Sequence, residues 1–315
     1  MDTVTDLLAP QAGEIYVDCT AGLGGHAAAI GARLAKAGSG TIVLNDMDPA
    51  NIARAQAHVS QVCQSCAGVK VMTVTGDGGR VGGNFVDVPR KLANMGLAAD
   101  MVLADLGFAS NHVDDGSRGF SFMHDGPLDM RMDPSIALSA ADLVNQLSEA
   151  ELGDIITELG EEKHARRIAK KVVQERRQSP ILTTARLAAV VRSGVPGANA
   201  SRIHPATRTF QALRIAVNDE LGSLMALLAG IHEGTRLVGR GTPGWLKPGA
   251  RIAIITFHSL EDRPVKESFA GLVKAGLAVD VSGGARGPSE AEENANPRAR
   301  SAKVRVIQLA KTIAG

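Results

Sequence analysis

The sequence has few aromatic residues, few cysteines and no excess of charge of either sign. Aromatic residues make up only 3% of the 315 residues, which argues against a single-strand binder built on rows of stacking rings. Three cysteines, an odd number, predict a reducing compartment without a disulfide framework, and the CxxC at Cys63 and Cys66 lacks the two further ligands that zinc needs. Since Lys and Arg number 34 against 33 Asp and Glu, any site for a polyanion must be a local patch.

Long hydrophobic runs are also missing. No apolar stretch reaches membrane-spanning length, and residues 1–6 lack the basic region and apolar core of a signal peptide. We therefore expect a cytoplasmic protein that does not associate with membranes. The chain is 44% hydrophobic, which is enough to bury the core of one large or two modest domains.

Strand-like and helix-like segments alternate in the first third of the chain. Strands are predicted at 15–18, 41–46, 69–75 and 100–106, and helices at 26–36, 49–62 and 86–94. A strand at 250–257, a helix at 260–274 and a strand at 303–309 follow near the end. This alternation predicts a doubly wound α/β fold, in which helices cover both faces of a largely parallel sheet.

The middle of the chain predicts helices with no strand between them. Ser139 and Ser148 are plausible N-caps, Gly160 can end a helix, and Thr184 can begin another. Helices are expected at 161–177 and 184–192, then a Gly- and Pro-rich linker at 194–205 and a long helix at 206–228. We therefore predict a discontinuous α/β domain, 1–134 and 206–315, that carries an inserted all-helical module at 135–205.

The most informative stretch is the loop after the first strand, Asp18-Cys19-Thr20-Ala21-Gly22-Leu23-Gly24-Gly25-His26. Glycines let a backbone pass close to a ligand, and the helix behind them offers unpaired N–H groups. NAD(P)-dependent dehydrogenases share the pattern Gly22-x-Gly24-x-x-Ala27. Asp18 favours instead an S-adenosylmethionine (SAM) site, because a carboxylate there can receive the methionine ammonium group. Asp46, after the next strand, is placed to hold ribose hydroxyls.

Two later strands end in polar residues that should face the same crevice. Asp105 ends the fourth strand, and ligands of open α/β sheets lie beyond the carboxyl ends of the strands. His258 follows the fifth strand and is predicted to orient or contact the substrate. No nucleophile elbow surrounds Ser259, so we reject a catalytic triad; Ser259 or the acids after it could simply cap a helix.

A basic ridge is predicted on the helix at 161–177. Arg166, Arg167, Lys170 and Lys171 lie along adjacent rows of this helix. Such a ridge is either a solvated face or a surface that contacts phosphates.

Several long strings accompany the glycine loop: SRGFSF at 117–122, GPLDMRMD at 126–133, RTFQALR at 208–214, the segment from His258 to Lys266, and NPRARSAK at 296–303. In this order, from about Tyr16 to Val306, they resemble the RsmH (MraW) family, bacterial 16S rRNA (cytosine-N4)-methyltransferases. Two departures stand out. Ala109-Ser110-Asn111-His112 occupies the place where the family usually has Ser-Ser-Pro-Gln, and Pro264 replaces a branched apolar residue.

The resemblance implies a Rossmann-like class I SAM-dependent methyltransferase with an inserted helical module. Its substrate would be N4 of a cytidine of 16S rRNA in the decoding centre (P-site region) of the small ribosomal subunit. By position, the implied SAM contacts are Gly24, Gly25, His26, Asp46, Phe85, Asp105 and His112. The glycine turn and His26 would meet the methionine end, Asp46 the ribose and Phe85 the adenine.

The exocyclic amine of cytosine is a poor nucleophile, because its lone pair is delocalised into the ring. An enzyme should therefore accept hydrogen bonds from the N4 protons. Asp105 is the candidate catalytic acceptor, with the backbone carbonyls of Leu106 and Gly107 as alternatives. The substrate-binding candidates are Arg131, Arg166, Lys170, His258 and Arg298. Two rival interpretations stay open: an NAD(P)-dependent dehydrogenase, and a non-enzymatic ribosome-assembly factor that has kept the fold.

Overall fold

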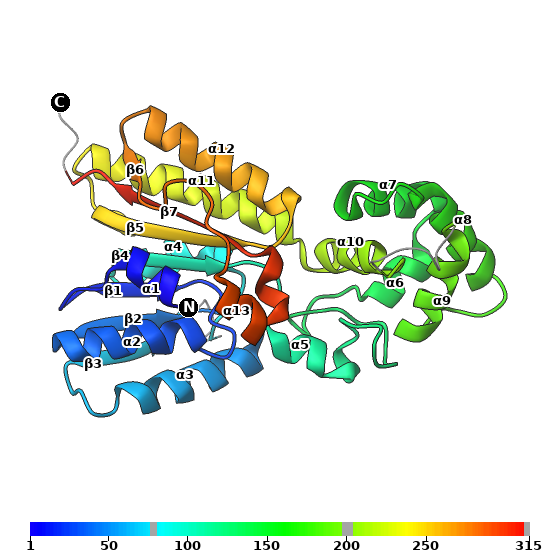
Figure 1. Ribbon diagram of the computed structural model, residues 1–315, viewed down its shortest axis with the longest axis horizontal. Coiled ribbons are helices and arrows are strands. Elements are labelled where there is room, and N and C mark those ends of the chain that lie inside the picture. Colours follow the sequence, from blue (N-terminus) through cyan, green and yellow to red (C-terminus); the bar gives the residue numbers. More distant parts are fainter. Residues whose placement is uncertain (76–80, 197–203, 312–315) are drawn as a thin grey trace. The chain divides into compact units, whose positions relative to one another are not determined.

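The computed structural model describes residues 1–75, 81–196 and 204–311 (Figure 1). The chain divides into two compact units, one of Met1–Gly107 with Leu221–Gly315 and one of Phe108–Glu220. The second unit is helical and extends beyond the expected 135–205 on both sides. The reason is packing, because Leu128, Met130 and Phe210 lie in the hydrophobic core of that unit. Most of the predicted linker at 194–205 lies outside the described residues.

The first unit contains one seven-stranded sheet in the order β3-β2-β1-β4-β5-β7-β6. Its strands are β1 Ile15–Asp18, β2 Gly40–Leu44, β3 Val69–Thr73, β4 Ala99–Asp105, β5 Leu246–Thr256, β6 Ala278–Asp280 and β7 Lys303–Leu309. The pairs from β3 through β5 are parallel, whereas β7 runs antiparallel to β5 and β6. This is a Rossmann-like order, and it reverses between β1 and β4, where such sheets bind their ligands.

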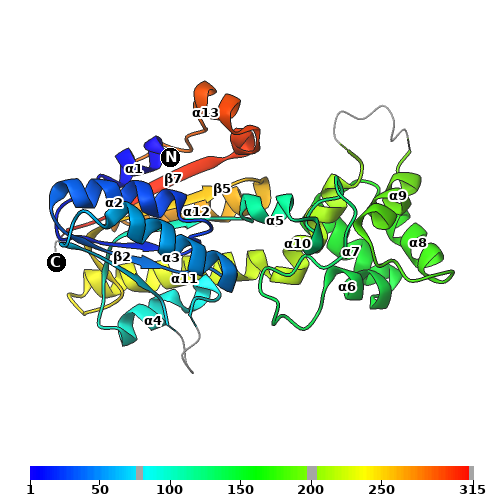
Figure 2. The ribbon, with the colours of Figure 1, turned by 90° about the horizontal axis from the view of Figure 1, so that it is seen from below.

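Helices cover both faces of this sheet. Alternate strand residues point to opposite sides, so Tyr16 lies in one core and Val17 in the other. The Tyr16 face is covered by α1 Asp2–Leu8, α2 Gly25–Ala37 and α3 Pro49–Cys63, and the Val17 face by α4 Val88–Asn94, α11 Glu220–Gly239 and α12 Ser259–Lys274. Figure 2 shows α1 and α2 across the sheet from α4 and α11. The predicted doubly wound architecture is confirmed.

The second unit packs its helices around one apolar core. They are α6 Ala140–Gln146, α7 Glu149–Gly160, α8 Ala165–Arg176, α9 Thr184–Gly194 and α10 Thr207–Asn218. The short helix α5 Ser110–Asp114 contributes no residue to this core. Ser139 and Ser148 are the N-caps of α6 and α7, as predicted, and each forms a full capping box. The cap of α9 is Thr183 rather than Thr184, whose side chain is buried and hydrogen-bonded within the unit.

The structure departs from the expected secondary structure near Asp219 and in β6. The long helix expected at 206–228 is two helices, because Asp219 adopts a left-handed φ of 47° between α10 and α11. Aspartate tolerates this conformation better than most residues, and the stretch 215–221 contains neither Gly nor Pro. The short strand β6 was also not predicted. Among the helices that the structure describes, none is long and apolar enough to cross a membrane.

Candidate functional site

The glycine turn is built where β1 passes into α2. Gly22 and Gly24 adopt left-handed φ values of 53° and 85°, which side chains disfavour. The Gly22 N–H donates a 2.7 Å hydrogen bond to Asp46 Oδ2, and the Asp48 N–H donates to Asp46 Oδ1 at 2.8 Å. Asp46 therefore lies against the turn, and its carboxylate holds both the turn and the backbone after β2.

Gly24 is required by packing as well as by conformation. A Cβ at this position would lie 3.1 Å from the Ala55 Cα and 3.2 Å from a Val59 methyl of α3. Gly25 is different, since its Cβ would meet only the flexible Met1 sulfur at 3.5 Å. The absence of a side chain at Gly24 thus lets α3 approach the turn.

We expect Gly24→Val to lower the melting temperature and to abolish SAM binding together. Valine would be strained at a φ of 85° and would clash with the backbone of Ala55, which cannot move away cheaply. Gly25→Ala should keep the wild-type melting temperature. Thermal unfolding and calorimetry with SAM measure both quantities. A Gly24→Val protein with unchanged SAM affinity would contradict this placement of the cofactor.

Asp18 stabilises the turn through hydrogen bonds at the end of β1. Its side chain is buried, the Tyr16 hydroxyl donates to Oδ2 at 2.8 Å, and the Thr20 N–H donates to Oδ1 at 3.1 Å. Burial raises the pKa of Asp18 to about 7. Because Asp18 is only 1% exposed and protein groups engage both of its oxygens, we assign Asp18 to supporting the loop rather than to receiving a ligand ammonium group.

Asp105 ends β4 beside the turn. Its backbone N–H donates to the Thr20 hydroxyl at 2.7 Å, and its Oδ2 lies 3.8 Å from His26 Nε2. Within the described part of the chain, neither Asp105 Oδ1 nor His26 Nδ1 has a hydrogen-bond partner, although both atoms are buried. A buried carboxylate oxygen without a hydrogen-bond partner suits a ligand that is cationic or donates a hydrogen bond.

The charge states of these groups follow from burial. Burial, together with the negative charges of Asp18 and Glu261, raises the pKa of Asp105 to about 7. Burial lowers the pKa of His26 to about 4, so His26 is neutral at pH 7. The carboxyl of Asp105 is therefore half-ionised near neutral pH, which is the range in which a proton acceptor works best.

Three further predicted site residues of the α/β unit, Phe85, His258 and Arg298, begin or lie on short turns and a helix start. Phe85 begins a short 3₁₀ turn, Phe85–Asp87, and packs against the core on the Val17 side. His258 is the N-cap residue of α12, and its ring lies against Glu261. Arg298 is exposed on the 3₁₀ turn Pro297–Ser301.

His112 and Arg131 belong to the helical unit. His112 is buried in α5 and stacks on Phe120, with ring centroids 5.0 Å apart. Arg131 forms a two-pronged pair with Asp129, at 2.8 and 2.7 Å, and donates to the Ile136 carbonyl at 3.0 Å. The guanidinium of Arg131 is thus bonded to residues of its own loop. We therefore assign Arg131 to supporting that loop instead of contacting the substrate directly.

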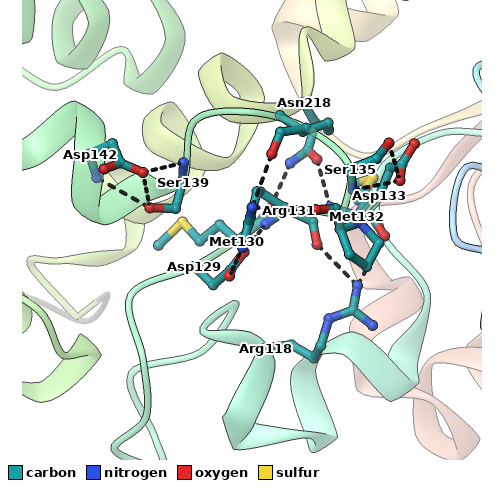
Figure 3. Close-up of polar contacts among 12 residues, drawn as sticks. Arg118, Asp129, Met130, Arg131, Met132, Asp133, Ser135, Ser139, Asp142 and Asn218 are labelled. Atoms are coloured by element: carbon teal, nitrogen blue, oxygen red, sulfur yellow. Dashed lines mark hydrogen bonds and ion pairs between the residues drawn. The ribbon is translucent and has the colours of Figure 1, made fainter.

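The loop around Arg131 is held from two sides (Figure 3). Asn218 of α10 accepts from the Met132 N–H and donates to the Met130 carbonyl, both at 2.8 Å. Arg118 donates to the carbonyls of Arg131 and Met132. These bonds keep buried Met130 at a left-handed φ of 62°, which an unsupported loop would not maintain.

Two of the four cations on the basic ridge of α8 are in ion pairs and two are not, among the residues that the structure describes. Arg166 pairs with Asp154 at 2.6 Å, and Lys171 pairs with Glu175 at 2.7 Å. Arg167 and Lys170 are exposed, and the described residues offer them no hydrogen-bond or ion-pair partner. Of the four cations, these two are the ones available to an external anion.

Sequence reasoning missed the role of Glu261. Its side chain is 2% exposed, and its two oxygens face the Phe257 N–H and the ring of His258. The sequence gives one signal, an acid three residues after an N-cap position, which is also the ordinary signature of a helix cap.

The sequence matches a known protein family over almost its whole length. Residues 1–310 match the MraW methylase family. The ribosomal RNA small subunit methyltransferase H of Syntrophotalea carbinolica is 43% identical, over 98% of this chain and 95% of its own length. The protein of the same name from Geotalea uraniireducens is 44% identical, over 97% and 95%.

Solved structures share less with the chain. A putative SAM-dependent methyltransferase from Streptococcus mutans aligns with a TM-score of 0.36 at 10% identity, over 98% of this chain and 48% of its own. The family match spans almost the whole chain, including the glycine turn and the strand ends that carry Asp105 and His258. The chain belongs to the MraW methylase family, a family of SAM-dependent methyltransferases.

Proposed function

We propose that this protein methylates N4 of a cytidine in the 16S rRNA of the small ribosomal subunit, in the P-site region of the decoding centre. The substrate class is supported by full-length relatives named as small-subunit rRNA methyltransferases. The observation that carries the chemistry is the buried, unpartnered Asp105 oxygen beside the glycine turn, within the part of the chain described. The site of action is the cytoplasm, where ribosomal subunits are assembled.

The residues present fit SAM. The glycine turn and neutral His26 would hold the methionine end, Asp46 the ribose and Phe85 the adenine, with His112 as a further contact implied by family position. Within the described part of the chain, Asp105 Oδ1 has no hydrogen-bond partner and suits the positive charge of the sulfonium. When bound, SAM supplies a methyl group on a cationic sulfur, which is a good leaving group.

The protein's own contribution is alignment and proton acceptance. The target base must be unpaired or flipped to bring its amine to the strand ends. Asp105 would accept a hydrogen bond from that amine, which concentrates electron density on the nitrogen and orients its lone pair toward the methyl group. His26 is neutral at pH 7 and adds no positive charge that would repel the cofactor.

The decisive experiment follows labelled methyl from SAM into assembled small subunits and into deproteinised rRNA. Nucleoside mass spectrometry then identifies the modified atom. We expect N4-methylcytidine in one RNA species. Labelling of a different atom would overturn the proposal, as would subunit binding without methyl transfer, which a non-enzymatic assembly factor predicts. Fluorescence titration with NADH tests the dehydrogenase alternative, and we expect no binding.

We propose that the helical unit contacts the RNA through α8. Neutralising Arg167 and Lys170 to glutamine should leave SAM affinity intact and weaken subunit binding. The slope of log affinity against log salt should fall by up to about two units, one for each lost phosphate contact.

The matched control neutralises the two cations that are already paired, Arg166 and Lys171. It removes the same formal charge and should change the salt slope less, because Asp154 and Glu175 engage these side chains in the free protein. Equal slopes for the two double variants, or no change in either, would show that this face of α8 is solvated and does not contact phosphates.

A further inference from the structure

A histidine and a glutamate form a second polar pair at the carboxyl end of the sheet. His258 Nε2 lies 3.1 Å from Glu261 Oε1, and the two side chains are 14% and 2% exposed. The second oxygen, Oε2, accepts a 2.8 Å hydrogen bond from the Phe257 N–H at the end of β5. A glutamate that is fixed at one oxygen therefore presents its other oxygen to an imidazole.

The pair lies at the same end of the sheet as Asp105. β4 and β5 are parallel neighbours, with Asp105 opposite Ile255 in register, and His258 follows Ile255 by three residues. The negative charge of Glu261 also acts on Asp105. Among the described residues, His258 Nδ1 is buried and has no hydrogen-bond partner, and Nε2 is close to Glu261 without an aligned hydrogen bond. Catalytic hydrogen bonds often tighten only when substrate binds.

Helix capping alone does not explain this arrangement. In a capping box the glutamate would accept the N–H of the N-cap residue itself, which here is His258. Glu261 instead takes the N–H of the preceding residue, Phe257, and turns its free oxygen to the histidine ring. A carboxylate in that position fixes which ring nitrogen carries the proton.

We propose that His258 takes up the proton released from the target amine, and that Glu261 is the positioning residue that keeps Nδ1 as the accepting nitrogen. The inference rests on the proposed function and gives this site a proton acceptor distinct from Asp105. Asp105 holds the amine through one N–H, and His258 Nδ1 removes the proton from the other.

The step balances without a further reactant. The lone pair of the amine nitrogen forms a bond to the methyl carbon as the carbon–sulfur bond breaks. The electron pair of the broken bond stays on sulfur, which becomes a neutral thioether. The nitrogen then carries one proton too many and a positive charge. That proton passes to Nδ1, the imidazolium is stabilised by the Glu261 carboxylate, and solvent removes the proton after product release.

Glu261→Gln tests the positioning role, because glutamine keeps the hydrogen bond with the Phe257 N–H and should reverse the tautomer of His258. Its amide oxygen can still accept the Phe257 N–H, but its NH₂ group now faces Nε2 and donates to it. The ring proton should therefore move to Nδ1, which can no longer accept. Carbon and nitrogen NMR shifts of the SAM-free protein report this exchange of tautomers. The signal of His258 among the eight histidines is assigned by its loss in His258→Gln.

The expected kinetic effect is a fall in kcat with little change in KM for the small subunit. Loss of a general base typically costs about 10²–10⁴-fold, so His258→Gln should fall in this range and Glu261→Gln near its lower end. Asp262→Asn is the matched control: its carboxylate pairs with Arg305 and Lys303 instead, so the tautomer and kcat should stay unchanged.

Three outcomes would overturn the inference: a His258→Gln enzyme with wild-type kcat, a Glu261→Gln protein with the wild-type tautomer, or a tautomer change in Asp262→Asn. The proposed function fails separately, if the wild-type protein does not methylate N4. If Glu261→Gln does not fold, the kcat of His258→Gln decides the question.

Discussion

Replacing Asp105 with asparagine is expected to slow methyl transfer by about 10²–10⁴-fold, because the charged acceptor of the amine N–H is lost. Asparagine keeps the shape of the side chain, but it is a weaker acceptor and can present a donor to the amine. The effect should appear in single-turnover rates at saturating SAM, where weaker cofactor binding no longer contributes. A rate restored at saturation would make Asp105 a cofactor ligand only, with the carbonyls of Leu106 and Gly107 as the acceptors.

The same variant should not destabilise the SAM-free protein. Burial raises the pKa of Asp105 from 3.8 to about 7, so the folded state binds more protons than the unfolded state between these values. The stability that the wild-type protein derives from this group therefore falls as pH rises from about 4 to about 7. Asp105→Asn lacks this loss, and its melting temperature relative to wild type should rise over that window. A lower melting temperature at pH 8 would assign Asp105 a structural role.

Much of the α/β unit could be predicted because its strands are buried and punctuated by glycines. The strands Ile15–Asp18 and Lys303–Leu309 have the predicted bounds, and the glycine turn lies at the switch between β1 and β4. The strand Ala278–Asp280 was missed because three residues, two of them exposed, carry no periodic pattern. The break at Asp219 was missed because the pair Asn218-Asp219, although both residues tolerate left-handed backbone, stands between two apolar helical segments with no Gly or Pro next to it.

The polar residues of the site were found by residue type, but their partners depend on contacts distant in sequence. Arg131 is a conspicuous cation in its string, yet only the folded loop pairs it with Asp129 and the Ile136 carbonyl. Gly24 has the pattern of a ligand turn, yet the nearest obstacle to a side chain is α3. A pattern identifies which residues can do chemistry, whereas packing decides which of them remain available for it.

Asp46→Ala is expected to weaken SAM and its demethylated product by the same large factor. Hydrogen bonds to a charged acceptor contribute about 1.5–3 kcal/mol each. Two such bonds to the ribose hydroxyls would correspond to about 10²–10⁴-fold in affinity. Calorimetry with both ligands measures the two factors. Asp48→Ala is the matched control, because Asp48 is also buried but its side chain caps α3 at the Ala50 N–H. It should cost about 1 kcal/mol of stability and leave SAM affinity unchanged.

Asp46 also accepts the Gly22 N–H, so its loss could act on the glycine turn rather than on the ribose. 5′-Methylthioadenosine separates these two routes, since it carries the adenine and ribose of SAM without the methionine end. If Asp46 binds the ribose, Asp46→Ala weakens this fragment about as much as it weakens SAM. If Asp46 acts only by shaping the turn around the methionine end, the fragment binds wild type and variant equally. That second result would remove Asp46 from the ribose site, because the carboxylate would then be fully used by the backbone of the turn and of residue 48.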